Sequence, residues 1–162
     1  MTYLALKWLH LIGSALLFGT GLGIGFFAWF GYRMALQRNE LGLLQGVLTL
    51  TVIADTVFTA LAAALQPITG LALFFMTGGR WDSPWLWWVM GVYVLVGACW
   101  LPVVAIQIRL RNRARAARSI DELGPEFHRR FRLWFILGWP AFAGVMVLFA
   151  LMLLRGYFGY FG

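Results

Sequence analysis

Four long apolar runs constrain this chain more than any other feature of its sequence. The hydrocarbon layer of a membrane is about 30 Å thick, and a helix needs about 20 residues to cross it. The chain of 162 residues is 62% hydrophobic and only 12% charged, whereas a typical soluble domain is about a quarter charged. We therefore predict an all-α polytopic membrane protein, a single domain over residues 1–162 with four transmembrane helices in a bundle. The expected helices span about 4–31, 43–76, 84–117 and 126–158.

The positive charges predict how this bundle lies in the membrane. Ten of the 13 basic residues lie on one side of the expected bundle, just after the first helix or around the connection between the third and fourth helices, and the other three (Lys7, Arg80 and Arg155) lie near the opposite side. Basic loops stay in the cytoplasm, so both termini are expected outside it. In a bacterial inner membrane this places His10 near the periplasmic face. The net charge of +7 is thus a topology signal, which makes the lipid bilayer the expected partner and excludes nucleic acid.

A stripe of small residues runs along the first helix from its histidine. At about 100° per residue, side chains that recur every three or four positions share one face of a helix. Very small residues on that face let a second helix or a flat cofactor approach the backbone closely. The sequence therefore predicts a groove in this helix, with one metal-competent side chain at its end. The residues of this stripe are His10, Gly13, Ser14, Gly21 and Gly25.

Polar side chains within the second and third apolar runs form a second candidate feature. Such groups are costly in lipid, so they are expected to face the bundle interior. Asp55 has no basic residue nearby on its own helix, so we expect it to be protonated or paired with Arg33 or Arg109 of another helix. The set is predicted to supply proton or hydrogen-bond partners, or else to serve helix packing. Its members are Asp55, Gln66, Trp100 and Gln107.

The chemistry open to His10 is limited by what the rest of the chain lacks. The sequence holds no HExxH motif, P-loop or dinucleotide fingerprint, and His128 lies at the opposite membrane face. His10 can serve as an axial ligand of haem b, or bind copper together with Met76, Met90 or Met152. The third alternative is an interfacial histidine that is hydrogen-bonded within the bundle.

Short motifs along nearly the whole chain resemble a known family. In the first half these are Lys7-Trp8-Leu9-His10, Phe18-Gly19-Thr20-Gly21, Asp55 and Gln66-Pro67-Ile68-Thr69-Gly70. In the second half they are Cys99-Trp100-Leu101-Pro102-Val103-Val104, Gln107 and Leu137-Gly138-Trp139-Pro140-Ala141. Together they resemble a bacterial family of predicted four-helix integral membrane proteins whose domain has no assigned function.

The first helix also resembles, more distantly, those of HemJ-type protoporphyrinogen oxidases and CopD-type copper-resistance membrane proteins. In the HemJ type a Lys-x-x-His pattern is associated with a haem b ligand, and Lys7 and His10 match it. A second functional lysine of that family has no counterpart, because Lys7 is the only lysine here. The resemblance implies a haem b protein with a redox or electron-transfer role, with a quinone, an oxygen species or a porphyrin as partner. The alternative is a non-catalytic copper-handling or accessory membrane protein, and homo-oligomers fit either reading.

Overall fold

The computed structural model describes residues 1–155, which form four long helices and no strand within that range. The helices are α1 (Thr2–Arg38), α2 (Leu41–Ala54) continued through the π-helical segment η1 (Asp55–Ala60) into α3 (Leu61–Met76), α4 (Pro84–Ala116), and α5 (Gly124–Leu153) after a short 3₁₀ turn, η2 (Asp121–Leu123). Counting α2–η1–α3 as one rod, each of the four is long and apolar enough to cross a membrane. The predicted all-α class with four spans is confirmed.

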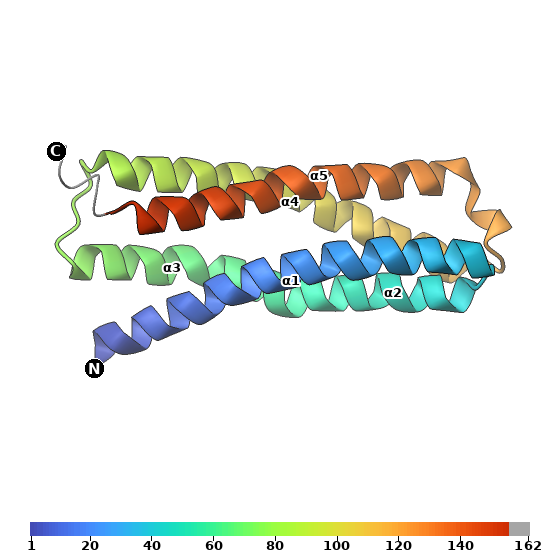
Figure 1. Ribbon diagram of the computed structural model, residues 1–162, viewed down its shortest axis with the longest axis horizontal. Helices are drawn as coiled ribbons and strands as arrows, with labels where there is room; N and C mark the ends of the chain where they lie inside the picture. The colour runs from blue at the N-terminus through green and yellow to red at the C-terminus, as the bar shows by residue number, and fades with distance from the viewer. Residues whose placement is uncertain (156–162) are drawn as a thin grey trace.

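The helices alternate in direction along the bundle (Figure 1). The α1–α2 turn and the α4–α5 connection lie at one end, and most of the arginines of the chain lie in or near these connections, on the helix ends that they join. The start of α1, the α3–α4 connection and the end of α5 lie at the other end. The two groups of basic residues that the sequence separates therefore occupy opposite ends of the molecule, which we call the basic end and the far end.

The end of the first helix differs from the one expected. The first helix does not end near Tyr32 but continues to Arg38, because Tyr32 and Ala35 are buried among the other helices and no proline interrupts the run. Asn39 then ends the helix in the left-handed conformation, with φ 51°, which frees the chain to turn. The connection to α2 is only Asn39 and Glu40. At the other terminus, the expected end of the last helix near 158 lies outside the described residues.

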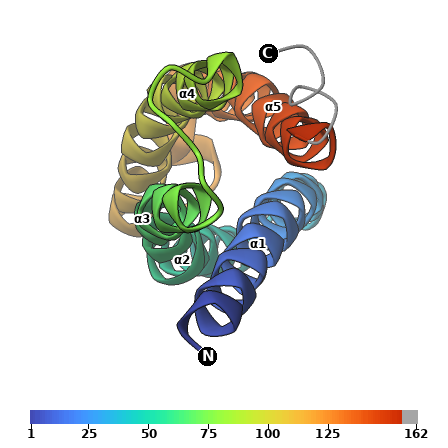
Figure 2. The same ribbon diagram turned by 90° about the vertical axis from the view of Figure 1, so that its left-hand side faces the viewer.

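The tightly packed part of the bundle lies toward the basic end. Its fully buried side chains include Leu44, Leu48, Leu110 and Phe131, contributed by α2, α4 and α5. Tyr32 of α1 stacks on Phe131 with ring centroids 3.8 Å apart. From this core α1 runs away from α5 toward its own N-terminus, as Figures 1 and 2 agree. The far half of the bundle is therefore more open than the basic half.

The second membrane-spanning rod is irregular where it passes the middle of the bundle. Six residues, Asp55–Ala60, form a turn and more of π-helix, a feature that often marks functional sites. Pro67 follows within α3, and its missing N–H leaves the carbonyl of Ala63 without its helical partner. The Tyr93 hydroxyl of α4 donates to that carbonyl. Tyr93 thus stabilises the irregular rod and ties it to α4.

Candidate functional site

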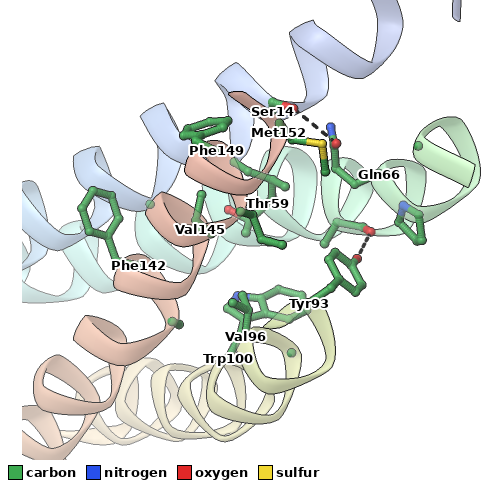
Figure 3. A pocket seen from close by; sticks show the side chains of 18 of the residues that line it. Ser14, Thr59, Gln66, Tyr93, Val96, Trp100, Phe142, Val145, Phe149 and Met152 are labelled. Carbon is green, nitrogen blue, oxygen red and sulfur yellow. Dashed lines mark hydrogen bonds between the residues drawn. The ribbon is translucent and has the colours of Figure 1, made fainter. Parts of the chain in front are cut away.

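A cavity of about 940 Å³ lies inside the bundle and is lined by all four helices. Most of its wall is aliphatic or aromatic, and it extends from Gln107 and Trp134 at the edge of the core to Thr77 and Arg155 at the far end. Its size is that of pockets for drug-sized ligands or cofactors. Figure 3 shows part of the wall from close by. The polar or charged side chains that line it include Lys7, His10, Ser14, Asp55, Thr59, Gln66, Trp100 and Gln107.

His10 is held by a hydrogen bond that determines which of its ring nitrogens is free. Its Nδ1 lies 2.8 Å from Oγ1 of Thr69, and the same hydroxyl lies 2.8 Å from the carbonyl of Leu65. A carbonyl only accepts, and the hydroxyl has one proton. Both contacts are hydrogen bonds only when Thr69 donates to Leu65 and the Nδ1–H of His10 donates to Thr69. The neutral imidazole then carries its free lone pair on Nε2, on a residue that lines the cavity.

The small residues beside His10 serve the contact between α1 and α3. The Gln66 amide nitrogen donates to the His10 carbonyl at 2.9 Å, and the Ser14 hydroxyl donates to the same carbonyl at 2.8 Å. A Cβ at Gly13 would overlap that amide nitrogen, and one at Gly70 would lie 3.1 Å from Cε1 of His10. Gly13 therefore faces Gln66 of α3. Farther along α1, Gly21 and Gly25 do line the cavity, with nothing within 4 Å of a Cβ at Gly25 and the Phe142 ring 3.8 Å from one at Gly21.

This packing makes a testable prediction for Gly13. We expect Gly13→Ala to lower the free energy of unfolding by about 1–3 kcal/mol, because the added methyl group displaces the Gln66 amide from the His10 carbonyl. Gly23 of the same helix is the matched control, since a Cβ there meets nothing within 4 Å. Gly23→Ala should be neutral or slightly stabilising. Denaturation of the purified variants, followed by helical circular dichroism, measures the difference, and equal stabilities would refute the packing role.

Asp55 lies in a second polar cluster, deeper in the membrane-spanning part. The Trp134 indole donates to Oε1 of Gln107 at 3.2 Å. An indole N–H can only donate a hydrogen bond, so the Gln107 atom that it faces must be the amide oxygen. This fixes the amide orientation of Gln107, so that its nitrogen faces and donates to Oδ2 of Asp55. The Trp100 indole donates to Oδ1 of Asp55 at 3.2 Å. Both carboxylate oxygens thus accept N–H donors, and Asp55 itself is only 6% exposed.

The partners of Asp55 correct one expectation. Of the two alternatives expected for Asp55, protonation or pairing with Arg33 or Arg109, the pairing is wrong, because no arginine within residues 1–155 forms an ion pair with this side chain. The neutral donors Trp100 and Gln107 take that place. The sequence singled out both of them by their position on α4, but it gave no sign that they converge on Asp55.

Thr59 and Thr69 were not among the predicted site residues. Thr59 lies one turn after Asp55, is 9% exposed, and has a buried hydroxyl without a hydrogen-bond partner among residues 1–155. Thr69 orients His10. The helical spacing places Thr59 on the same face as Asp55, but a threonine in an apolar helix usually bonds to its own backbone, so only the tertiary arrangement assigns these two residues to the site.

The two polar clusters lie on one cavity but apart from each other. Asp55 and Gln66 are eleven residues apart, which is about 16 Å along a helix. The His10 cluster is therefore nearer the far end, and the Asp55 cluster nearer the core. His128 is at the basic end, where its Nδ1 lies 2.6 Å from the Tyr32 hydroxyl. Both histidines thus have separate partners.

The donors for a metal ion are few in the described part of the chain. Residues 1–155 contain no group of three or more His, Cys, Asp or Glu side chains that could hold an ion. Among the methionines considered with His10, Met90 and Met152 line the cavity, whereas Met76 is half exposed and does not line it. Among the described residues, Met90 and Met152 are thus the soft donors that share the cavity with His10.

Comparison with known proteins gives a family but no activity. No curated protein and no solved structure matches this chain. A family of membrane proteins matches residues 4–156, which is nearly the whole chain and includes all four helices and both polar clusters. The chain belongs to this family, described as predicted integral membrane protein (DUF2269).

Proposed function

We propose that this integral membrane protein binds haem b through His10 and carries electrons in a bacterial inner membrane, with its basic end in the cytoplasm. The observation that carries the proposal is the hydrogen bond from Nδ1 of His10 to Thr69. Metal-ligating histidines donate the other ring N–H in this way, which fixes the tautomer and the ring orientation. Nε2 is then the nitrogen available to iron.

The cavity fits such a group in size and in chemistry. Its volume of about 940 Å³ and its aliphatic and aromatic wall suit a large flat macrocycle. Lys7 and Arg155 line the same cavity and carry charges opposite to those of the two haem propionates. Met90 or Met152, which line the same cavity, would be a further side chain able to hold the iron, as methionine does in some electron-transfer cytochromes. When bound, haem b supplies one-electron redox chemistry.

The experiment that tests the proposal is a spectrum of the purified protein. Cells are supplied with excess haem during expression, and the protein is purified in detergent. We expect a Soret band that shifts on reduction with dithionite, with close to one haem for each chain. A colourless preparation that retains full helical circular dichroism would refute the proposal.

Copper handling is the second candidate function, and one observation favours it. His10, Met90 and Met152 line one cavity, and imidazole with thioether is a soft donor set that suits Cu(I). Elemental analysis of the same purified protein for iron and copper distinguishes haem binding from copper binding. Copper that copurifies with the wild type and is lost in Met152→Leu would support this reading over haem.

A further inference from the structure

The cavity is open to the lipid side of the bundle between α1 and α5. Several residues of its wall are more than half exposed on the outer surface of the helices, where lipid surrounds a spanning helix. They are Leu11, Leu22, Phe26 and Phe30 of α1, Trp139 of α5 and, on the other side, Leu101 of α4. In Figure 2 the two helices separate toward the start of α1. An apolar molecule dissolved in the bilayer can therefore reach the interior sideways.

Aromatic side chains bridge this opening. Phe18 of α1 packs against Phe142 and Phe149 of α5, with ring centroids 5.4 and 5.9 Å apart. No hydrogen bond joins α1 to α5 in this part of the described chain, where the two helices meet only through apolar contacts. Such contacts can part to admit a ligand without breaking a polar network.

Inside the cavity, Asp55 and Thr59 offer complementary hydrogen-bonding groups. Each Asp55 oxygen accepts one N–H and retains a second lone pair. The Thr59 hydroxyl has no partner within residues 1–155, and a buried hydroxyl left unpaired costs about 1–3 kcal/mol. Both residues belong to the cavity wall, and Figure 3 shows Thr59 between Trp100 and Val145. Rotation of Thr59 about χ1, a fast motion, lets its hydroxyl meet a polar atom in the cavity.

We propose that the cavity binds an isoprenoid quinone and its quinol, with the head group at Asp55 and Thr59. A quinone carbonyl accepts a hydrogen bond from Thr59, and a quinol hydroxyl donates one to the Asp55 carboxylate. The Trp100 indole, which donates to Asp55 and lines the same cavity, would offer an aromatic face to the head group. The apolar tail leaves through the opening between α1 and α5. The choice of quinone among lipid-soluble oxygen compounds rests on the proposed redox function.

Titration with decylubiquinone tests this site without any need for haem. Quinones quench tryptophan fluorescence, so binding beside Trp100 is followed in the purified protein in detergent. We expect saturable quenching in the wild type and about fivefold weaker binding in Thr59→Val, the loss of one hydrogen bond. Thr59→Ser should restore the affinity. Thr56→Val is the matched control, because the Thr56 hydroxyl already bonds to the Val52 carbonyl on the same segment and should leave binding unchanged.

The reduced probe tests the role of Asp55. Asp55→Asn replaces one acceptor oxygen by an NH2 group, so we expect decylubiquinol to lose more affinity than decylubiquinone in this variant. Quenching that does not saturate, or that is the same in Thr59→Val as in the wild type, would overturn the proposed quinone site. Both titrations are repeated in His10→Ala. Saturable, Thr59-dependent quenching in a protein that never shows a Soret band would uphold this site and refute only the haem proposal.

Discussion

Replacement of His10 by alanine is expected to abolish the Soret band of the purified protein. Within residues 1–155, His10 is the one histidine that lines the cavity. Its loss therefore removes the side chain proposed to bind the iron. The fold should survive, because the His10 backbone carbonyl, which holds Ser14 and Gln66, remains in place. Absorbance at the Soret maximum, divided by protein concentration, measures the effect.

The matched control for this substitution is the other histidine. His128 lies at the basic end beside Tyr32 and does not line the cavity, so His128→Ala should keep the full haem content. Thr69→Val tests the orientation of the ligand separately. This variant loses the hydroxyl that accepts the hydrogen bond from Nδ1 of His10. Haem binding should weaken about 10–100-fold, whereas the Soret band should still appear at high haem concentration. Equal haem content in His10→Ala and in the wild type would exclude His10 as the ligand.

The second large effect is expected in the buried polar cluster, where Gln107→Leu should destabilise the protein by about 3 kcal/mol. The substitution removes the donor to Asp55 and the acceptor of Trp134 at once. A buried carboxylate oxygen and an indole N–H are then left unpaired, and each such group costs about 1–3 kcal/mol, more when it is charged. Unfolding of the detergent-solubilised variants, followed by circular dichroism, gives the change in free energy.

Two further variants make this result interpretable. Gln37 is exposed on the basic end of α1, so Gln37→Leu makes the same chemical change at a surface site and should alter stability by less than about 0.5 kcal/mol. The double variant Asp55→Leu with Gln107→Leu should lose less than the sum of the two single variants, because the two side chains interact directly. Strict additivity, or a Gln107→Leu protein as stable as Gln37→Leu, would contradict the network.

The structure divides the bundle into a packed half and a half built around a cavity. Phe131 and its aromatic neighbours fill the space between α1 and α5 at the basic end. At the far end α1 instead turns toward α3, where Gly13 and Gly70 allow Gln66 and His10 to pack closely. The close contact at Gly13 of α1 and Gly70 of α3 thus holds α1 against α3 and apart from α5, which leaves space for the cavity.

The sequence by itself determined the membrane class, the four spans and the gathering of arginines at one end. These properties depend on the length and hydrophobicity of local runs, which need no knowledge of how helices meet. It also placed His10, Gln66, Asp55 and Gln107 on helix faces from their spacing alone. The predicted end of the first helix was wrong by several residues. The chain stays helical up to Arg38 because Ala35 is buried against other helices.

Only the tertiary structure decided how these faces are used. It paired Asp55 with Trp100 and Gln107 in place of an arginine, oriented His10 through Thr69, and assigned Gly13 to helix packing while Gly21 and Gly25 line the cavity. The physical reason is that a polar group buried in lipid takes the nearest donor or acceptor. Which group is nearest depends on the angle at which α1 leaves α5 and on the π-helical turn at Asp55, and neither leaves a local signal in the sequence.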